Sequence, residues 1–407
     1  PRPGMINMTL RGYYRDHHRD IQFVPVYFSY ERVLEISSYL DERKGHQKKT
    51  ESLRDLFGVF RYFKLDFGQV SVNFGEPISL EQFLSMRVDS DLEMIEPDKH
   101  KAICRELGHH IVQGINAAIP VNPTQILATL FVHAGHLEIP EERLRRQLRF
   151  LTTLIEADQI SSIFDQSDAQ IIDYFLSTSG AERQLRDGEP MITITPGGLI
   201  DMRYYSNSVT HLFVLPSLIA NRLIQEPMID PEPFFDQLTV LAPLLDAICF
   251  SKLAPSAGRI NELLEIFDYK TEGQQVPSVR VDSPLASDLI QIAGIIEPAL
   301  KQIALACALL KVKPDLLDDL ATINERIKTL TITTTAFNPE DLILTERLIQ
   351  MLSQTQPIND RKAQDNANWI KPQAALATLI SEAGQNDLQH LALDLIKENI
   401  QSAATTR

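Results

Sequence analysis

Candidate functional residues gather where two segments that read as β-strands come to an end. The first segment, FVPVYFSYE at residues 23–31, is almost continuously apolar. Such a run is typical of a strand that is buried on both faces of a largely parallel sheet. Pro25 removes a backbone donor from this strand, which requires an edge, a bulge or a functional bend. Glu31 ends the strand and begins a helix, where the helix dipole favours a carboxylate.

The second segment, GQVSVNFGEPISL at residues 68–80, alternates apolar and polar side chains and then breaks at a turn. Turn chemistry accounts for Gly75 and Pro77. It does not account for Glu76, which stands between them. This carboxylate is therefore a candidate to orient a basic group of a substrate-binding site.

Two further groups of residues have the chemistry to hold an anionic substrate. Lys44, Lys48 and Lys49 lie in a polar loop, where they either contact a phosphate or are only solvated. The other group precedes the apolar run LFVLPSL and consists of Arg203, Tyr204, Tyr205, Asn207 and His211. This second group either binds substrate or packs its aromatic rings at the end of a hairpin, with the histidine as a cap.

None of the ten histidines belongs to a recognisable catalytic or metal-binding set. None has Asp five residues later, and the Glu at that offset from His46, His133 and His136 is interpreted as coincidence. The paired histidines are not joined by carboxylates or cysteines at ligand spacing, so we expect no metal site. The three cysteines are widely spaced and form no CxxC pair, which predicts a reducing compartment and no disulfide.

At their separation along the chain, the two strand segments resemble the last strands of a glycerolipid acyltransferase domain. The closest similarity is to the membrane-bound glycerol-3-phosphate 1-O-acyltransferases of bacteria. The block at residues 203–218 is similar to the YYRN…H…LPSL signature of the same family, with Ser206 where the family usually has Arg. The resemblance is dense to about residue 76 and near residues 203–218, and thin after about residue 226.

This resemblance implies an enzyme of phospholipid biosynthesis. Such an enzyme transfers a fatty acyl group from acyl-CoA or acyl carrier protein to the sn-1 hydroxyl of glycerol 3-phosphate, giving lysophosphatidate. No metal or bound cofactor is implied, because the thioester is already activated. Peripheral attachment to the cytoplasmic side of the inner membrane is also implied. The expected substrate-binding residues are Pro25, Tyr30, Glu31, Glu76, Arg203 and Tyr204, with Lys48 and Lys49 added on grounds of charge.

The catalytic motif of that family is absent from these 407 residues. In the family the motif is HxxxxD, in which the His removes the hydroxyl proton and the Asp orients the His. A Gly- and Arg-rich phosphate-binding motif is absent too, and PRPGMINMTL resembles the stretch that directly follows it. We therefore expect the chain to be the C-terminal part of a longer enzyme and inactive by itself. The alternative is a non-catalytic helical interaction protein with a partial α/β domain.

Charge and hydropathy narrow the choice of partners. The net charge is −15, yet residues 1–64 carry twelve Lys or Arg against eight Asp or Glu. This excess either suits anionic ligands and lipid headgroups or marks ordinary solvated helices, whereas the acidic remainder argues against nucleic acid. The most apolar region, residues 289–312, is interrupted by Glu297, Pro298 and Lys301. We expect a buried helix kinked at Pro298 and no membrane-spanning segment.

The elements that position these residues are expected to be α/β first and mostly α afterwards. Helical periodicity over residues 31–41 and from about residue 51 separates the two strands. The resulting β-α-α-β crossover implies parallel pairing. Residues 1–120 are expected to be the C-terminal half of an acyltransferase α/β domain.

Residues 121–407 are expected to form a helical C-terminal domain. Asn122 is expected to cap its first helix, as Ser79 is expected to cap a short helix in the preceding domain. One β-hairpin is expected at residues 190–205, turning at the Pro-Gly-Gly of residues 196–198. The helices and the hairpin together resemble a winged helix in outline.

Overall fold

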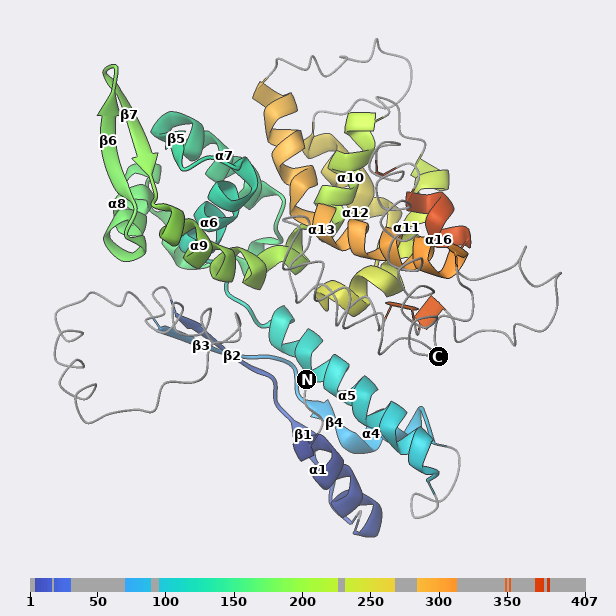
Figure 1. Cartoon of the computed structure of the whole chain (residues 1–407). Helices are drawn as coiled ribbons and strands as arrows, with labels where there is room; N and C mark the ends of the chain where they lie inside the picture. The colour runs from blue at the N-terminus through green and yellow to red at the C-terminus, as the bar shows by residue number, and fades with distance from the viewer. Residues whose placement is uncertain are drawn as a thin grey trace, which may run out of the picture. The chain divides into compact units, whose positions relative to one another are not determined.

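A computed structural model of the chain describes residues 4–16, 18–30, 70–88, 95–225, 231–267, 284–312, 348–349, 351–352, 370–376 and 379–380. Figure 1 shows its helices and strands. The chain divides into two compact units, Pro1–Val209 and Thr210–Arg407. The domain boundary predicted at residue 120 falls inside the first unit.

The first unit begins with two short antiparallel strand pairs and three helices. The elements are α1 (Gly4–Arg15), β1 (Gln22–Phe23), β2 (Val26–Tyr30), β3 (Val70–Phe74), β4 (Ile78–Ser79), α4 (Leu80–Ser85) and α5 (Pro97–Ala117). β1 pairs with β4, and β2 pairs with β3. Helix α1 packs against α5, and their apolar faces share a core that includes Leu10, Tyr13, Phe83, Ile103 and Leu107. As predicted, Ser79 caps α4 by accepting a hydrogen bond from the amide of Gln82.

The predicted parallel pairing of the two strands is wrong, and so is the prediction that both faces of the first strand are buried. β2 and β3 are antiparallel, with Phe28 opposite Val72. Cross-strand partners project on the same face, and on this face Phe28 is 54% and Phe74 72% exposed. The apolar run was thus a mark of one exposed apolar face rather than of two buried ones. The helices predicted between the strands fall within residues 31–69, outside the described residues.

A group of helices with a small sheet completes the first unit. Its elements are α6 (Pro123–Ala134), β5 (Glu138–Pro140), α7 (Glu141–Thr153), α8 (Asp168–Ser179), β6 (Glu182–Arg186), β7 (Glu189–Thr193) and α9 (Pro196–Val209). The sheet is antiparallel in the order β5-β7-β6. Helix–strand–helix–helix–strand–strand with this sheet order is the arrangement of a winged helix, with the β6–β7 hairpin as the wing (Figure 1).

The hairpin is real but lies earlier than predicted. Its turn is at Asp187 and Gly188, which both have positive φ, of 53° and 85°. Asp-Gly is a strong signal for a two-residue hairpin turn. The predicted turn at residues 196–198 instead opens α9, because Pro is well suited to the first position of a helix. The hydroxyl of Thr195 accepts a hydrogen bond from the amide of Gly198 at 3.0 Å and so caps that helix.

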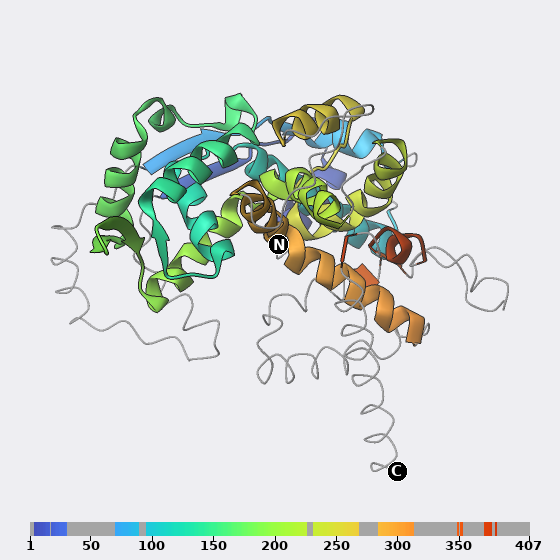
Figure 2. The same cartoon turned by 90° about the horizontal axis from the view of Figure 1, so that it is seen from above.

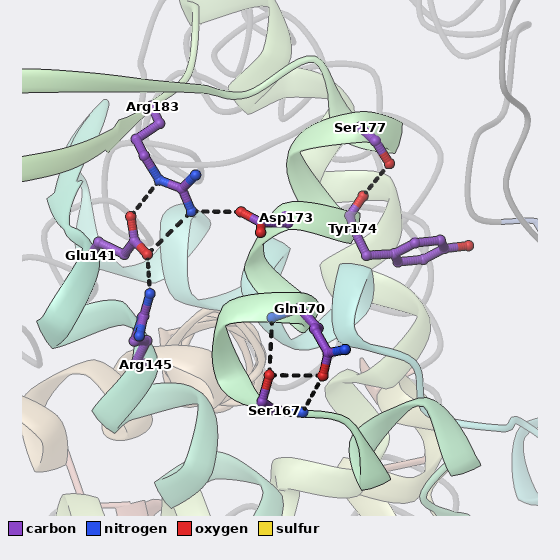
Figure 3. Close-up of polar contacts among 8 residues, drawn as sticks. All are labelled: Glu141, Arg145, Ser167, Gln170, Asp173, Tyr174, Ser177 and Arg183. Carbon is purple, nitrogen blue, oxygen red and sulfur yellow. Dashed lines mark hydrogen bonds and ion pairs between the residues drawn. The ribbon is translucent and has the colours of Figure 1, made fainter.

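A buried ion-pair cluster ties together three elements of the winged helix (Figure 3). Glu141, which opens α7, is only 4% exposed. Its carboxylate accepts hydrogen bonds from Arg145 on the same helix and from Arg183 on β6, the latter at 2.6 Å. Arg183 also donates to Asp173 of α8 at 2.8 Å. We call these four residues the Glu141 cluster.

The regular elements of the second unit are all helices among its described residues. It contains a 3-10 turn at Thr210–Phe213, α10 (Val214–Gln225), α11 (Pro231–Cys249), α12 (Ala257–Ile266), α13 (Pro284–Val312) and α16 (Ile370–Leu376). α13 is the central helix of the unit and packs against α10, α11 and α16 (Figure 1, Figure 2).

Among the described residues, Ser287–Lys311 of α13 is long and apolar enough to cross a membrane by length and composition alone, with a mean hydropathy of 1.6. Of its most apolar 18-residue window, 72% is buried inside the protein, and mostly buried core helices pass the same length and composition test.

Candidate functional site

Pro25 lies at a tight junction where three backbones meet. Its carbonyl oxygen accepts a hydrogen bond from the amide of Gly75 at 2.8 Å. A Cβ built on Gly75 would lie 2.8 Å from the carbonyl oxygen of Gly114 in α5, and a Cβ on Gly114 would lie 2.6 Å from Cγ of Pro25. Only glycine fits at either position without a shift of the surroundings. Pro25 lies between β1 and β2, where the chain passes from one strand to the next and no strand hydrogen bond is needed from its nitrogen.

Glu76 follows directly after this junction. Its side chain is exposed in the loop that leads from β3 to β4. Glu76 lies near Pro25, because the preceding residue, Gly75, is hydrogen-bonded to the Pro25 carbonyl. Tyr30 is paired with Val70 and lies at the other end of the β2–β3 ribbon. The structure thus places Pro25 and Glu76 together and separates both from Tyr30 by the length of β2.

The inner face of β2 meets the first turn of α6 through polar groups. Asn122 and Gln125 form a capping box, each side chain bonding to the backbone amide of the other residue at 2.9–3.0 Å. The side-chain amide of Asn122 donates to the hydroxyl of Ser29 at 3.3 Å, and that of Gln125 donates to the hydroxyl of Ser208 on α9 at 3.0 Å.

Tyr27 completes this polar contact. Burial raises the pKa of its phenol, although hydrogen bonding with Ser208 and Gln125 acts in the opposite direction. We call Tyr27, Ser29, Asn122, Gln125 and Ser208 the polar seam. It joins β2, α6 and α9, and its groups are neutral near pH 7. The polar seam can therefore position a neighbouring group but has no side chain that would accept a proton from a substrate hydroxyl.

Arg203 and Tyr204 lie on α9 and not at the end of a hairpin. Arg203 is exposed, and Tyr204 is 45% exposed. The ring of Tyr204 meets that of the buried Tyr205 edge to face, with centroids 5.5 Å apart. Tyr204 also lies close enough to Tyr27 to influence its pKa. The predicted block on α9 is thereby linked to β2 through the polar seam.

Of the remaining candidates, the structure describes Asn207 and His211. Asn207 is exposed on α9, and His211 belongs to the 3-10 turn that opens the second unit. Glu31, Lys44, Lys48 and Lys49 lie outside the described residues. In the part of the chain that the structure describes, no three His, Cys, Asp or Glu side chains gather as a metal site would require.

Sequence reasoning singled out only Asn122 of the polar seam, as a helix cap, and missed Tyr27, Ser29, Gln125 and Ser208. The Asn-x-x-Gln spacing of a capping box points to Gln125. No comparable local signal exists for Tyr27 and Ser208, because their contact joins residues far apart in the chain.

Comparison with known proteins gives consistent matches. The family described as "Glycerol-3-phosphate acyltransferase C-terminal region" matches residues 39–357. The chain is 33% identical over 273 residues to the glycerol-3-phosphate acyltransferase of Pseudomonas putida (strain GB-1), covering 65% of this chain and 33% of that protein. It is 35% identical over 258 residues to that of Pseudomonas aeruginosa (strain LESB58), covering 61% of this chain and 31% of the relative.

A more distant relative matches over a longer stretch. The glycerol-3-phosphate acyltransferase of Shewanella pealeana is 28% identical over 325 residues, which is 78% of this chain and 40% of the relative. The matched part of the chain thus spans between about a third and two fifths of the length of these relatives.

Proposed function

The chain belongs to the glycerol-3-phosphate acyltransferase family, and we propose from this that it takes part in acylating the sn-1 hydroxyl of glycerol 3-phosphate. The acyl group comes from acyl-CoA or acyl carrier protein, and the product is lysophosphatidate for phospholipid synthesis. The observation that carries this proposal is the family match over residues 39–357, which includes the block at residues 203–218.

We assign residues 1–407 a substrate-positioning role rather than the proton transfer. Acyl transfer to a hydroxyl needs a general base. The sequence has no His with Asp five residues later, and the polar seam holds only neutral groups. The HxxxxD base would have to come from sequence outside these residues. No metal or bound cofactor enters the proposal, because the thioester is already activated.

The β2–β3 ribbon is proposed as part of the sheet of an acyltransferase α/β domain. Two features support this assignment. Each of the two strands has one partner among the described residues, so each has a free edge that can pair with a further strand. In a complete α/β domain, helices packed on the sheet would also cover the exposed apolar face formed by Phe28, Val70, Val72 and Phe74.

Five described residues are proposed to line the path of the acyl donor or of the phosphate. They are Pro25 with Glu76 beside it, Tyr30 at the far end of β2, and Arg203 and Tyr204 on α9. The polar seam supports this, because it fixes α9 against the inner face of β2. Glu31, Lys48 and Lys49 remain candidates on sequence grounds. We also propose peripheral attachment to the cytoplasmic side of the inner membrane, with α13 as a core helix rather than a span.

The test is an acylation assay on two proteins. Purified residues 1–407, free of host enzyme, are compared with the complete gene product, using labelled glycerol 3-phosphate and either acyl donor. We expect lysophosphatidate from the complete protein and none from residues 1–407. Product from residues 1–407 alone would overturn the positioning role, and a complete protein without an HxxxxD motif and without product would overturn the proposed function.

The second candidate is a non-catalytic interaction protein, and the winged-helix arrangement of residues 123–193 favours it. Nucleic acid is a poor partner for this module. Helix α8 carries Asp168 and Asp173, whose pairing with Arg149 and Arg183 neutralises the basic groups next to it. The same acylation assay distinguishes the two candidates, because an interaction protein gives no product in either form.

A further inference from the structure

A cavity of about 640 Å³ lies between α1 and the first half of α5, apart from the polar seam. This volume is in the range of small-molecule sites. Its apolar walls include Ile6, Ile95 and Pro97, and its polar lining comes from Asn7, Tyr14, His100 and Cys104. None of these residues was singled out by their sequence pattern, and the proposed acyl transfer uses none of them.

Among the described residues that line this cavity, the ionised side chains are the cations Arg11, Lys101 and Arg105, and none of these lining residues is Asp or Glu. Lys101 pairs with Asp98, whose Oδ1 lies 3.1 Å from its ammonium, and the Asp98 and Lys101 side chains are 95% and 69% exposed. Such a pair is screened by water and neutralises the cavity only weakly. The cavity therefore has a positive potential suited to an anion.

His100 adds a polarised donor and acceptor pair at the back of the cavity. Its ring is 8% exposed. Nε2 lies 2.6 Å from Oδ1 of Asn7, which also accepts a hydrogen bond from Nε of Arg11 at 3.0 Å. Because this amide oxygen can only accept, the proton of the neutral ring is on Nε2. Nδ1 then accepts from the hydroxyl of Tyr14, 3.4 Å away.

None of the titratable groups His100, Tyr14 and Cys104 carries a negative charge at neutral pH that would repel an anion. Burial, with a smaller contribution from Arg11, lowers the pKa of His100 below its ordinary value of 6.5. Burial raises the pKa of Tyr14 to about 12 and raises that of the Cys104 thiol as well. At neutral pH the described residues of the lining thus supply three cations, with neutral groups beside them.

We propose that the α1–α5 cavity binds a phosphate monoester that carries a short apolar group. Two Arg side chains offer the forked donors that match phosphate oxygens, and Lys101 adds a third positive charge. The volume exceeds that of phosphate alone, and the isoleucine and proline walls suit hydrocarbon. The ester is either a soluble molecule or the headgroup of a lipid. This inference does not depend on the acyltransferase activity, because it concerns binding.

Hexyl phosphate is the direct probe, titrated calorimetrically into the full chain. We expect saturable binding that is tighter than that of inorganic phosphate, and none with hexanol. The double variant Lys101→Gln/Arg105→Gln should bind at least about tenfold more weakly, since two charge-assisted contacts are lost. The matched control is Arg15→Gln/Lys99→Gln, two exposed cations on the same helices that do not line the cavity. Absence of binding, or equal weakening in both double variants, would overturn the proposal.

The ring of His100 gives a second readout by NMR, with His100→Gln to assign its signal. A bound anion stabilises the imidazolium, so hexyl phosphate should raise the pKa of His100. An unchanged titration of His100 at saturation would place the ligand elsewhere and overturn the proposal.

Vesicles separate the two sources of the ester. If the ligand is a lipid headgroup, phosphatidate vesicles sediment the chain, phosphatidylcholine vesicles do not, and hexyl phosphate releases it. If the ligand is soluble, hexyl phosphate binds in solution and neither kind of vesicle sediments the chain.

Discussion

At Gly75 and Gly114 the lack of a side chain allows the strand ends and helix α5 to approach within van der Waals contact of Pro25. The proline carbonyl is hydrogen-bonded to Gly75, and its ring rests on Gly114. This packing fixes the point at which the chain leaves β3 and therefore the position of Glu76. A single added methyl group at either glycine acts directly on that geometry.

We predict that Gly114→Ala lowers the free energy of unfolding by about 1–3 kcal/mol, because the new Cβ would lie 2.6 Å from the ring of Pro25. Chemical denaturation monitored by circular dichroism measures the change. The control is Gly12→Ala on α1, where no atom lies within 4 Å of the added Cβ. That variant should be stabilised by about 0.5–1 kcal/mol, since alanine is the better helix former. A neutral Gly114→Ala would show that Pro25 moves aside freely.

Lys48 and Lys49 lie outside the described residues, and their role stays a prediction from sequence. Replacing both with Glu in the full-length enzyme should raise the KM for the acyl donor several-fold at low ionic strength, because exposed charge pairs contribute at most about 1 kcal/mol each. The KM for glycerol 3-phosphate should change little, and the donor effect should shrink as salt shortens the Debye length to about 8 Å. Steady-state kinetics at two salt concentrations measure this. Arg15→Glu/Lys99→Glu is the charge-matched control, and a donor KM that stays constant at low salt would leave the two lysines as solvated charges.

At the scale of the elements, side-chain caps stabilise the starts of the helices, and ion pairs between residues far apart in the chain connect one element to another. The Glu141 cluster connects α7, α8 and β6 (Figure 3). Burial by itself would raise the pKa of Glu141, but hydrogen bonds from Arg183 and Arg145 outweigh it and lower the pKa below the ordinary value of 4.5. A carboxyl whose pKa is lower in the folded than in the unfolded state stabilises the fold above pH 4.5, and this contribution is lost as the pH falls through the folded-state value.

Glu141→Gln is therefore expected to lower the free energy of unfolding by about 2 kcal/mol near pH 7, because the partly buried Arg183 and Arg145 lose their shared acceptor. The difference from the wild type should shrink as the pH falls below 4.5 and through the lower folded-state pKa, at which the wild-type carboxyl becomes protonated. Denaturation curves across this pH range measure both effects. Glu138→Gln is the control, since its 3.4 Å pair with Arg186 is half exposed and should change stability by less than about 0.5 kcal/mol. Equal losses in the two variants, or a difference that does not vary with pH, would contradict the argument.

At the scale of the whole molecule, the chain forms two compact units, and the first presents an apolar surface on the β2–β3 ribbon. Phe28, Val70, Val72 and Phe74 are all between 45% and 72% exposed. They lie on one face of two strands whose outer edges are free among the described residues. Exposed apolar strands with free edges tend to pair with other chains.

Purified residues 1–407 are accordingly expected to self-associate. Phe28→Thr/Phe74→Thr should shift the protein toward the monomer, because threonine keeps the preference for strand while removing apolar surface. Size-exclusion chromatography with light scattering measures the mass. Met5→Thr/Met86→Thr removes two side chains that are as exposed, at 84% and 74%, but that lie on α1 and at the end of α4. This control should leave the mass distribution unchanged, and a monomeric wild-type chain would refute the expectation.

The sequence by itself determined the features that depend on neighbours along the chain. Asn122 and Pro123 begin α6 as predicted, and Gly135 ends it with a φ of 69°. Ser79 likewise begins α4. Helix caps form within a single turn, so the residues that make them are a few positions apart and their spacing is diagnostic. Family membership, shown by the match over residues 39–357, also follows from the motifs at residues 23–31, 68–80 and 203–218.

Only the tertiary structure decided what lies next to what across long stretches of chain. An apolar strand looks the same in sequence whether its partner is parallel or antiparallel, and β2 proved antiparallel to β3. The Pro-Gly-Gly of residues 196–198 fits a turn or the start of a helix equally well. Because β7, the last strand of this sheet, ends before these residues, they begin α9 instead of a hairpin turn. Tyr14 and His100 meet in the α1–α5 cavity although 86 positions separate them. Such contacts depend on the packing of whole helices and strands, which no short pattern of residues records.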